Sequence, residues 1–405
     1  MRPLSVQRVR RCGQGTSGRH AARGALLVVG LAVALAGCAG TSAPDTGREG
    51  RPPEDGTPPP GQFSADRAFG HLRSLVALGP RPAGSDAAAQ TRDYVRRHLE
   101  ALGLTVEEQE ATYEDTDGTI LPLANLEAVV PGEGGRGRFV VATPLDTARA
   151  ETFALVGANE GASGVALLLE VARVLVEEPL PYDVTLLFLD GERIEAGRYL
   201  GSELALQTLA EPPRLMLWID QVADADLVIH RDLWSHRVLR ESFFRAAERL
   251  GRGAAFPRTG AFDQIPGGHR VWFQHGWRRV VALADIRYGS DEPPGALWRT
   301  AEDDLAHVSA GSLGIAGRVV VAGLRDVAAH LARVDAHIVR PPAPAPKSAS
   351  VSEEVPAGTE AVVEPPVPDP ATPAPEASAP NPSVPKTTAP RPPVPNPPEM
   401  DVDGE

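Results

Sequence analysis

Residues 183–193 read DVTLLFLDGER, and the expected fold is built outward from this stretch. A short, continuous apolar run rich in Val and Leu is typical of a β-strand that is buried on both faces. The run ends abruptly in Asp190, Gly191, Glu192 and Arg193. In α/β proteins the segments that follow buried parallel strands carry the functional residues. Two acids and an arginine at this point therefore indicate an active site or the remains of one.

Segments with strand and helix patterns alternate on both sides of this stretch. Apolar residues at three- and four-residue spacing predict helices over residues 63–78, 86–103, 161–177, 196–209, 234–250 and 310–334. Alternating or short apolar runs predict strands over residues 104–113, 124–132, 138–143, 183–190, 214–220 and 278–285. This order predicts the α/β class: a three-layer α/β/α sandwich with a mixed, mostly parallel central sheet and an antiparallel edge.

The N-terminal segment has the pattern of a secretory signal. Basic residues are frequent before the apolar run GALLVVGLAVALAG at residues 24–37. This run is shorter than the ~20 apolar residues of a spanning helix, so we expect residues 1–37 to be a cleaved signal peptide. The sequence LAGC at residues 35–38 resembles the lipobox of bacterial lipoproteins. The resemblance implies lipidation of Cys38 and a membrane-anchored protein of the cell envelope, most simply at the periplasmic face of the outer membrane.

Two segments of biased composition flank one domain. Residues 38–61 have almost no large apolar side chain and are expected to form a flexible tether, and residues 341–405 form a Pro-rich tail that cannot build a core. Residues 62–340 remain as the folded domain. The chain has 2 cysteines, neither of them in this domain, so the domain depends on its hydrophobic core rather than on disulfides. A formal net charge of −13 without a basic stripe argues against nucleic-acid binding.

Acidic residues recur where the predicted strands end and in the loops behind them. Because the carboxyl ends of parallel strands meet at one edge of a sheet, we expect several of these acids to converge on one cleft. Converging carboxylates either bind a metal ion or raise one another's pKa values. The acids are Asp146, Glu160, Asp190, Glu192, Asp220 and Asp263.

Most of the domain, from LGPRPAGSDAAAQTRDYVRRHLEALGLTVEEQ to LWRTAEDDLAHVSAGSL, resembles the zinc-dependent aminopeptidases and glutaminyl cyclases. These enzymes share a co-catalytic zinc exopeptidase fold. The segments GANEGASGVALLLEVARVL, TLLFLDGER, RLMLWIDQV and FDQIP carry the resemblance in the family's order, and FDQIP together with ALWRTAEDD looks more like the cyclase branch.

The resemblance implies a role for each acid that matches a family motif. Glu192 stands at the position of the general base. Asp220 matches an acid that binds metal in two-zinc members and forms hydrogen bonds in cyclases, and Asp263 matches the acid of the cyclases' D-H-I-P segment. These three are the candidate catalytic residues, while Asp146 and Glu160 match metal ligands.

The other ligand positions hold Pro144, Arg193 and Arg299, and the resemblance therefore implies a degenerate member. Proline has no side-chain donor atom and arginine offers only N–H groups, whereas zinc needs lone pairs. A guanidinium about 4 Å from a divalent ion would be repelled by roughly 8 kcal/mol at an effective dielectric constant near 20. We therefore expect no cofactor, and we hypothesise that Arg193 or Arg299 fills the vacated space and pairs with Glu160 or Glu192.

The interpretation that follows is a lipid-anchored, inactive relative of zinc exopeptidases, a monomer that binds a peptide or an envelope protein. One alternative is an active zinc aminopeptidase or glutaminyl cyclase with a reduced metal site, or one relocated to other histidines. Another is a structural envelope protein whose Pro-rich tail is the working part. The histidines that relocation would draw on are His230, His236, His269, His275 and His307.

Overall fold

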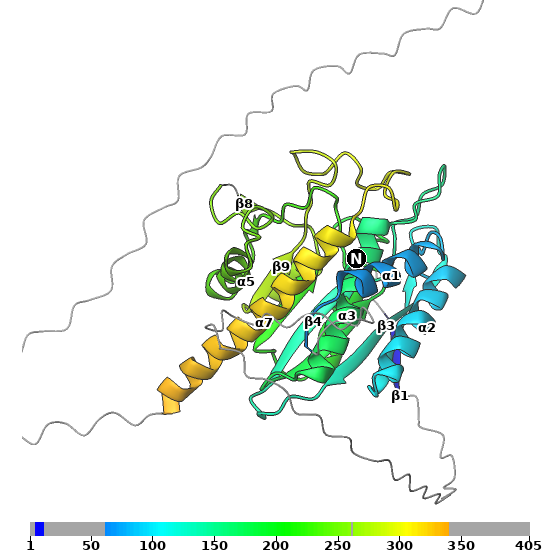
Figure 1. The fold of residues 1–405 in the computed structure, drawn as a ribbon. Helices are drawn as coiled ribbons and strands as arrows, with labels where there is room; N and C mark the ends of the chain where they lie inside the picture. Colours follow the sequence, from blue (N-terminus) through cyan, green and yellow to red (C-terminus); the bar gives the residue numbers. More distant parts are fainter. Residues whose placement is uncertain (1–4, 12–60, 261, 340–405) are drawn as a thin grey trace, which may run out of the picture. The chain divides into compact units, whose positions relative to one another are not determined.

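The computed structural model describes residues 5–11, 61–260 and 262–339. Its centre is a seven-stranded sheet in the order β1-β2-β3-β5-β4-β6-β9 (Figure 1). A separate pair joins β7 (Arg231–Asp232) to β8 (Phe262–Asp263). The strands of the main sheet are β1 (Ser5–Arg11), β2 (Val106–Glu114), β3 (Ile120–Val130), β4 (Arg138–Pro144), β5 (Asp183–Leu189), β6 (Leu215–Ile219) and β9 (Val280–Leu283).

The sheet is mixed and has a parallel half. β4 pairs in parallel with β5 and β6, and β6 pairs in parallel with β9. β3 joins β5 and β2 in antiparallel fashion, so three of the five pairings from β2 to β9 are parallel. The mixed, mostly parallel sheet with an antiparallel edge is therefore confirmed.

Strand β1 adds one more antiparallel pairing, at the edge of β2. It lies within residues 1–37, whose removal as a signal peptide stays a prediction. The remainder of that segment, the lipidation residue Cys38, the tether up to residue 60 and the tail at residues 341–405 lie outside the described residues. Among the helices that the structure describes, none is both long and apolar enough to cross a membrane.

Helices cover both faces of the sheet, which confirms the three-layer α/β/α arrangement (Figure 1). The predicted segment 196–209 contains only the short helix α4, because Gly197 has a positive φ of 79° and the regular helix starts at Leu200. The closing helix runs five residues beyond the predicted end at residue 334. On one face lie α1 (Ala65–Val76), α2 (Asp86–Ala101), α3 (Gly164–Glu177), α5 (Arg237–Arg249) and α7 (Ala310–Val339), and on the other lie α4 (Leu200–Thr208) and α6 (His269–Gln274).

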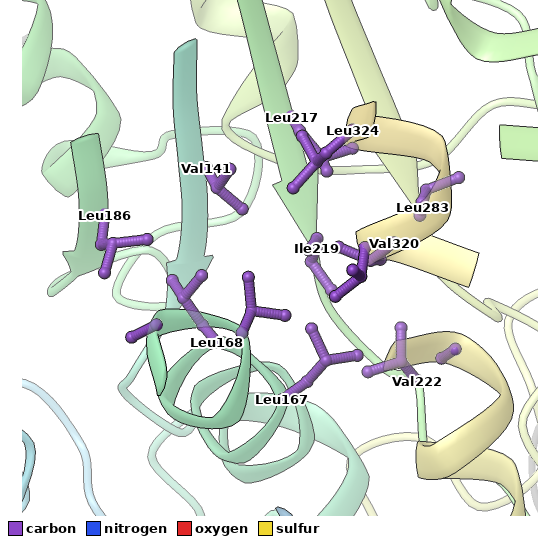
Figure 2. Packing of buried hydrophobic residues seen from close by; sticks show 14 of the residues in the cluster. Val141, Leu167, Leu168, Leu186, Leu217, Ile219, Val222, Leu283, Val320 and Leu324 are labelled. Carbon is purple, nitrogen blue, oxygen red and sulfur yellow. The ribbon is translucent and has the colours of Figure 1, made fainter. Parts of the chain in front are cut away.

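The central strands are buried on both sides, with alternate residues pointing to opposite layers. Val141 of β4 packs with Leu167 and Leu168 of α3 in the larger core (Figure 2). Its neighbour Val140 belongs to the second core, together with Trp272 of α6. Because both faces exclude water, each strand reads as a continuous apolar run.

A close approach behind β5 fixes the strand end that precedes Glu192. The backbone N–H of Asp190 donates to Asn125 Oδ1 at 2.9 Å, and Asn125 Nδ2 donates to the carbonyl oxygen of Gly201 at 2.8 Å. A Cβ on Gly201 would lie 2.5 Å from the carbonyl oxygen of Asp190. Only glycine at position 201 lets α4 approach the backbone of Asp190 this closely.

We therefore expect Gly201→Ala to lower the free energy of unfolding by about 1 to 3 kcal/mol, because backbone atoms must shift. Chemical denaturation measures this change. Gly70→Ala is the matched control: it lies within α1, and nothing stands within 4 Å of its added Cβ. That change should stabilise the protein by about 0.5 to 1 kcal/mol through helix propensity. Equal effects of the two changes would contradict the close-approach explanation.

Candidate active site

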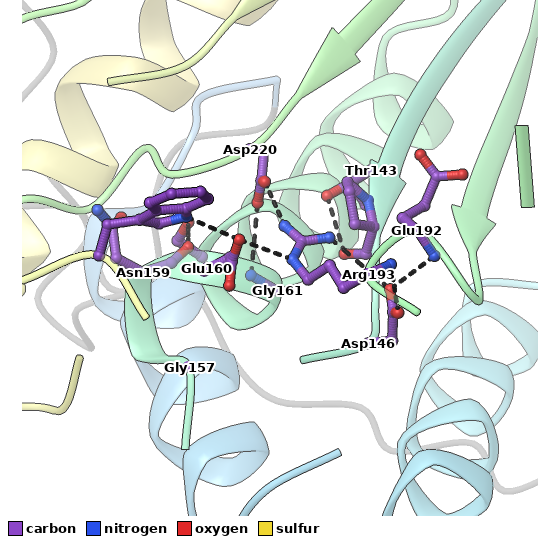
Figure 3. Close-up of polar contacts among 12 residues, drawn as sticks. Thr143, Asp146, Gly157, Asn159, Glu160, Gly161, Glu192, Arg193 and Asp220 are labelled. Carbon is purple, nitrogen blue, oxygen red and sulfur yellow. Dashed lines mark hydrogen bonds and ion pairs between the residues drawn. The ribbon is translucent and has the colours of Figure 1, made fainter. Parts of the chain in front are cut away.

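The site lies at the carboxyl ends of three neighbouring strands. Because β5, β4 and β6 are parallel neighbours, the residues after them meet at one edge of the sheet. Asp146 follows β4, Glu192 and Arg193 follow β5, and Asp220 follows β6. Glu160 joins them from the turn η1 (Ala158–Ser163), which precedes α3 (Figure 3).

The guanidinium of Arg193 lies among three carboxylates. Its Nε is 3.1 Å from Glu160 Oε1, its Nη1 is 3.7 Å from Asp146 Oδ1, and its Nη2 donates a short hydrogen bond to Asp220 Oδ2. The side chain of Arg193 is 4% exposed, and those of its three partners are at most 5% exposed. A buried arginine with three acidic partners is an ion-pair network from which water is excluded.

A second arginine reaches the same glutamate. Arg299 Nε donates to Glu160 Oε1 at 3.3 Å, and Trp298 Nε1 donates to the same oxygen at 2.9 Å. The guanidinium carbon of Arg299 lies 4.4 Å from the centre of the Trp298 ring, within cation–π range. The expected pairing with Glu160 is thus present for both arginines, whereas neither forms an ion pair with Glu192 within the described residues.

The turn η1 holds Glu160 in place through backbone contacts. Gly161 has a φ of 94°, its N–H donates to Asp220 Oδ1 at 3.4 Å, and a Cβ there would lie 2.5 Å from the carbonyl oxygen of Asp146. Asp303 accepts hydrogen bonds from the backbone N–H groups of Asn159, at 2.6 Å, and of Glu160, at 3.1 Å. The turn is therefore fixed both to the strand ends and to the loop that carries Arg299.

Glu192 faces the beginning of α4 rather than the arginines. Its Oε1 accepts the backbone N–H of Ser202 at 2.7 Å, and its Oε2 accepts the Ser202 hydroxyl at 3.2 Å. The backbone N–H groups of Glu192 and Arg193 donate to Asp146 at 3.3 and 3.0 Å. Asp146 therefore clamps the turn after β5.

The protonation of these acids follows from burial and charge. Burial raises the pKa of Glu192 to about 8, that of Asp146 to about 7 and that of Asp220 to about 6, although Arg193 opposes each rise. Burial acts in the same direction on Glu160, but there Arg193 and Arg299 outweigh it and lower the pKa below its usual value. Burial by itself lowers the pKa of Arg193, yet the surrounding acids raise it above its usual value.

Two acids of the predicted set have other partners. Asp190 is fully buried and pairs with Arg92 Nη1 at 3.1 Å rather than with Arg193 or Arg299. Asp263 forms an ion pair with Arg287 Nη2 at 2.7 Å and does not line the cavity described below. Within the described part of the chain, no group of three or more His, Cys, Asp or Glu side chains is arranged to hold a metal ion.

Sequence reasoning missed several supporting residues. Arg81 is fully buried, and its guanidinium donates to the carbonyl oxygens of Gly79, at 3.0 Å, Val156, at 2.7 Å, and Gly157, at 2.9 Å. Its place between two prolines in GPRPAGS is the one signal that sets it apart. Nothing in the sequence distinguishes Asp303, because an acid in the loop segment AEDD is expected to be exposed to solvent.

A cavity of about 470 Å³ opens over the cluster. Glu160, Glu192, Arg193, Asp220 and Arg299 line its polar side. Its other walls include the apolar or aromatic side chains of Tyr199, Trp218, Pro266, Ile286, Pro294 and Trp298. The volume and the mixed lining are typical of a site for a small molecule or a side chain.

Comparisons with known proteins agree with this architecture. The model of Peptidase family M28 matches residues 125–324. A glutaminyl cyclase from an Acidobacteriales bacterium has 27% sequence identity and a TM-score of 0.60, and the match covers 71% of this chain and 100% of that one. A search of the curated proteins gave no match.

Two exopeptidase structures are also similar. A leucine aminopeptidase precursor from Bacteroides thetaiotaomicron has 25% identity and a TM-score of 0.58, with 65% of this chain and 97% of that chain covered. A Zn-dependent exopeptidase from Parabacteroides distasonis has 22% identity and a TM-score of 0.58, with 64% and 97% covered. The resemblance inferred from the sequence motifs is thereby confirmed.

The raised pKa values make stability depend on pH. Asp146 and Glu192 bind protons more tightly in the folded protein than at the values near 4 of an unfolded chain. Between about pH 4 and pH 8 the folded state therefore holds more protons, and the free energy of unfolding falls as pH rises through this window. Glu160 adds no slope above about pH 5, because its lowered pKa leaves it ionised in both states.

We expect Glu192→Gln to flatten this decline by up to about 1 kcal/mol per pH unit, since glutamine keeps the Ser202 contacts of a protonated acid but does not titrate. Denaturation at pH 5 to 8.5 measures the slope. Glu151→Gln, at an exposed position, should leave it unchanged. A slope that Glu192→Gln does not alter would show that this carboxyl group is not buried as described.

Proposed function

Because this chain contains a domain of Peptidase family M28, we propose that it is a member in which an internal guanidinium replaces the metal and the cavity binds a ligand without catalysis. The observation that carries the proposal is the position of Arg193 between Asp146, Glu160 and Asp220. One similar structure is named a Zn-dependent exopeptidase, so zinc is the ion against which the site must be tested.

The donor atoms present do not fit zinc. Both oxygens of Asp146 accept backbone N–H groups, and both oxygens of Asp220 are engaged by Gly161 and Arg193. Glu160 Oε1 faces three N–H groups. In the described part of the chain only Glu160 Oε2 among these oxygens is without a hydrogen bond. A hydrogen-bonded oxygen can still bind a metal, but the guanidinium of Arg193 occupies the space between the three acids in which the ion would lie.

The charge of Arg193 also disfavours a metal ion at this position. Replacing the guanidinium by a metal would require the buried Arg193 to leave its three partners, and breaking a buried ion pair typically costs about 3 to 5 kcal/mol. The side chain would also need a new place in which its N–H groups are hydrogen-bonded. An ion that stayed beside the guanidinium would be repelled by it.

Glu192 is also a poor general base while no metal ion lies beside it. With a pKa of about 8, this carboxyl group is mostly protonated at neutral pH. A general base must be ionised to accept a proton. The cavity itself remains, with the size and apolar walls of a binding site, and this supports a binding role for the domain.

The proposed location is the cell envelope, with Cys38 as the lipidated residue. The support is the basic N-terminal segment, the apolar run at residues 24–37 and the LAGC sequence at residues 35–38. A tether over residues 38–61 would separate the domain from the membrane surface.

Metal analysis of the purified protein tests the pseudoenzyme proposal. We expect less than about 0.1 equivalent of tightly bound zinc, and no chelator-sensitive release of an aminoacyl anilide or cyclisation of an N-terminal glutamine. One equivalent of tightly bound zinc, or either chelator-sensitive activity, would overturn the proposal.

Restoration of the ligands gives the complementary test. Arg193→Glu combined with Arg299→His, with Pro144→His added as a third change, should create measurable zinc affinity by calorimetry. The matched control is Arg299→His alone, which leaves Arg193 in place and should gain no affinity. If the multiple variant folds but binds no zinc, the assignment of these positions to the family's ligands is wrong.

Lipid anchoring has its own test. In a bacterial host that processes lipoproteins, we expect the full chain to be found in the membrane fraction and Cys38→Ser to be found in the soluble fraction or to keep its signal peptide. Cys12→Ser, within the segment expected to be removed, should behave like the wild type. Membrane association that survives Cys38→Ser would contradict the proposed anchor.

A further inference from the structure

Arg299 has hydrogen-bonding capacity that the ion-pair network does not use. Its Nε contacts Glu160, whereas its Nη1 and Nη2 donate to no described residue, and its side chain is 37% exposed. The three side-chain nitrogens of Arg193, by contrast, each lie within ion-pair distance of a carboxylate. Of the two arginines, Arg299 is therefore the one whose guanidinium has N–H donors available to a ligand.

The position of Arg299 places those donors where two cavities meet. The larger cavity of about 470 Å³ and a smaller one of about 250 Å³ have Arg193, Ala196 and Arg299 in common as lining residues. Arg149, which is exposed, adds a further positive charge to the smaller cavity. A ligand that fills the larger cavity therefore has Arg299 at its border with a second, more polar space.

The orientation of Arg299 is held rather than free. Its guanidinium stacks on Trp298 and its Nε is tied to Glu160, so the two outer nitrogens form a preorganised fork of the kind that binds an anion through two N–H groups. Because Arg299 is already ordered in the unbound protein, binding an anion costs less side-chain entropy than it would with an unrestrained arginine.

The backbone carries a second, independent sign of a ligand site. Arg299 has a φ of 57° and Gln221 a φ of 49°, and these are the non-glycine residues with positive φ in the described part of the chain. Both line the larger cavity. Such conformations cost free energy that the surrounding structure must offset, and they concentrate at binding sites. Both outliers therefore lie at the wall of this cavity.

The walls restrict the chemistry of that ligand. The side chains of Trp218, Ile286 and Trp298 favour a ligand with an apolar body. The Nη1 and Nη2 groups of Arg299 favour an anionic group on that ligand. Glu195 lines the larger cavity and Asp115 the smaller one, so each further negative charge on a ligand would meet acids as well as arginines, whereas a monocarboxylate places its one charge at the fork of Arg299. A free cation would be repelled by the two guanidinium groups that line this cavity.

We propose that this cavity binds a monocarboxylate with an apolar body, whose carboxylate is held by Nη1 and Nη2 of Arg299 and whose body packs between Trp298 and Trp218. The inference rests on the proposed binding function of a metal-free domain. Two sources supply this chemistry: the C-terminus of a peptide that ends in an apolar residue, and a free aliphatic or aromatic acid.

Matched acid and amide probes test the proposal on the full chain by calorimetry. The pairs are the peptide Ala-Ala-Ala-Phe with a free or an amidated C-terminus, N-acetylphenylalanine with its amide, and octanoate with octanamide. We expect at least one acid to bind about 10- to 100-fold more tightly than its amide, which corresponds to about 1.4 to 2.8 kcal/mol. The pair with the largest preference identifies the source.

Variants at Arg299 then assign the preference to this side chain. Arg299→Gln should abolish the acid preference, Arg299→Lys should retain part of it, and Arg245→Gln, at an exposed position on α5, should leave it intact. Arg299→Asn is a second variant that relieves the positive φ. It should melt at least as high as Arg299→Gln, which loses the same contacts but keeps the strained φ, and it should lose the preference to the same extent. A loss of preference that followed stability would indicate a merely structural role.

The outcomes separate this inference from the proposed function. A metal-free protein that binds acids and amides equally, or binds none of the six probes at 1 mM, refutes the carboxylate site alone. An acid preference that survives Arg299→Gln and Arg299→Asn refutes it as well. An acid preference that disappears on chelation, in protein that contains zinc, refutes the metal-free site and with it the proposed function.

Discussion

Three buried carboxylates, those of Asp146, Glu160 and Asp220, surround the single guanidinium of Arg193, and the geometry of the site depends on this contact (Figure 3). The acids come from two strand ends and the turn η1, which the shared cation holds together. Neither the acids nor the arginine would be stable here alone, because a buried charge without a partner costs several kcal/mol. The network therefore acts as an internal clamp at the carboxyl edge of the sheet.

A cation within the chain differs from a bound metal in what it offers to a ligand. A metal ion accepts lone pairs and polarises the group that it binds, whereas a guanidinium only donates N–H groups in a plane. Residues 125–324, which match the model of Peptidase family M28, thus surround a cavity whose polar side contains the guanidinium groups of Arg193 and Arg299. Arg299, stacked on Trp298, places N–H donors at the wall of this cavity.

The order of strands and helices could be predicted because it depends on local patterns. β5 lies between two neighbours and two helical layers, so nearly every residue in it is apolar. The start of α4 was misplaced because it depends on the positive φ of Gly197, which an apolar period does not reveal. Similarly, β3 begins at Ile120, an exposed residue before the apolar run, and was predicted four residues too late.

The sequence by itself determined which residue types stand at the strand ends, since strand period and chain order place Asp146, Arg193 and Asp220 at one edge. Together with the resemblance to the zinc exopeptidases, it also led us to expect Arg193 or Arg299 beside Glu160 or Glu192, because repulsion among buried acids demands a cation. Only the tertiary structure decided that Asp263 turns to Arg287 and that both arginines pair with Glu160 rather than with Glu192. These partners are remote along the chain, and their choice depends on how the loops close over the sheet, which no local pattern of residues specifies.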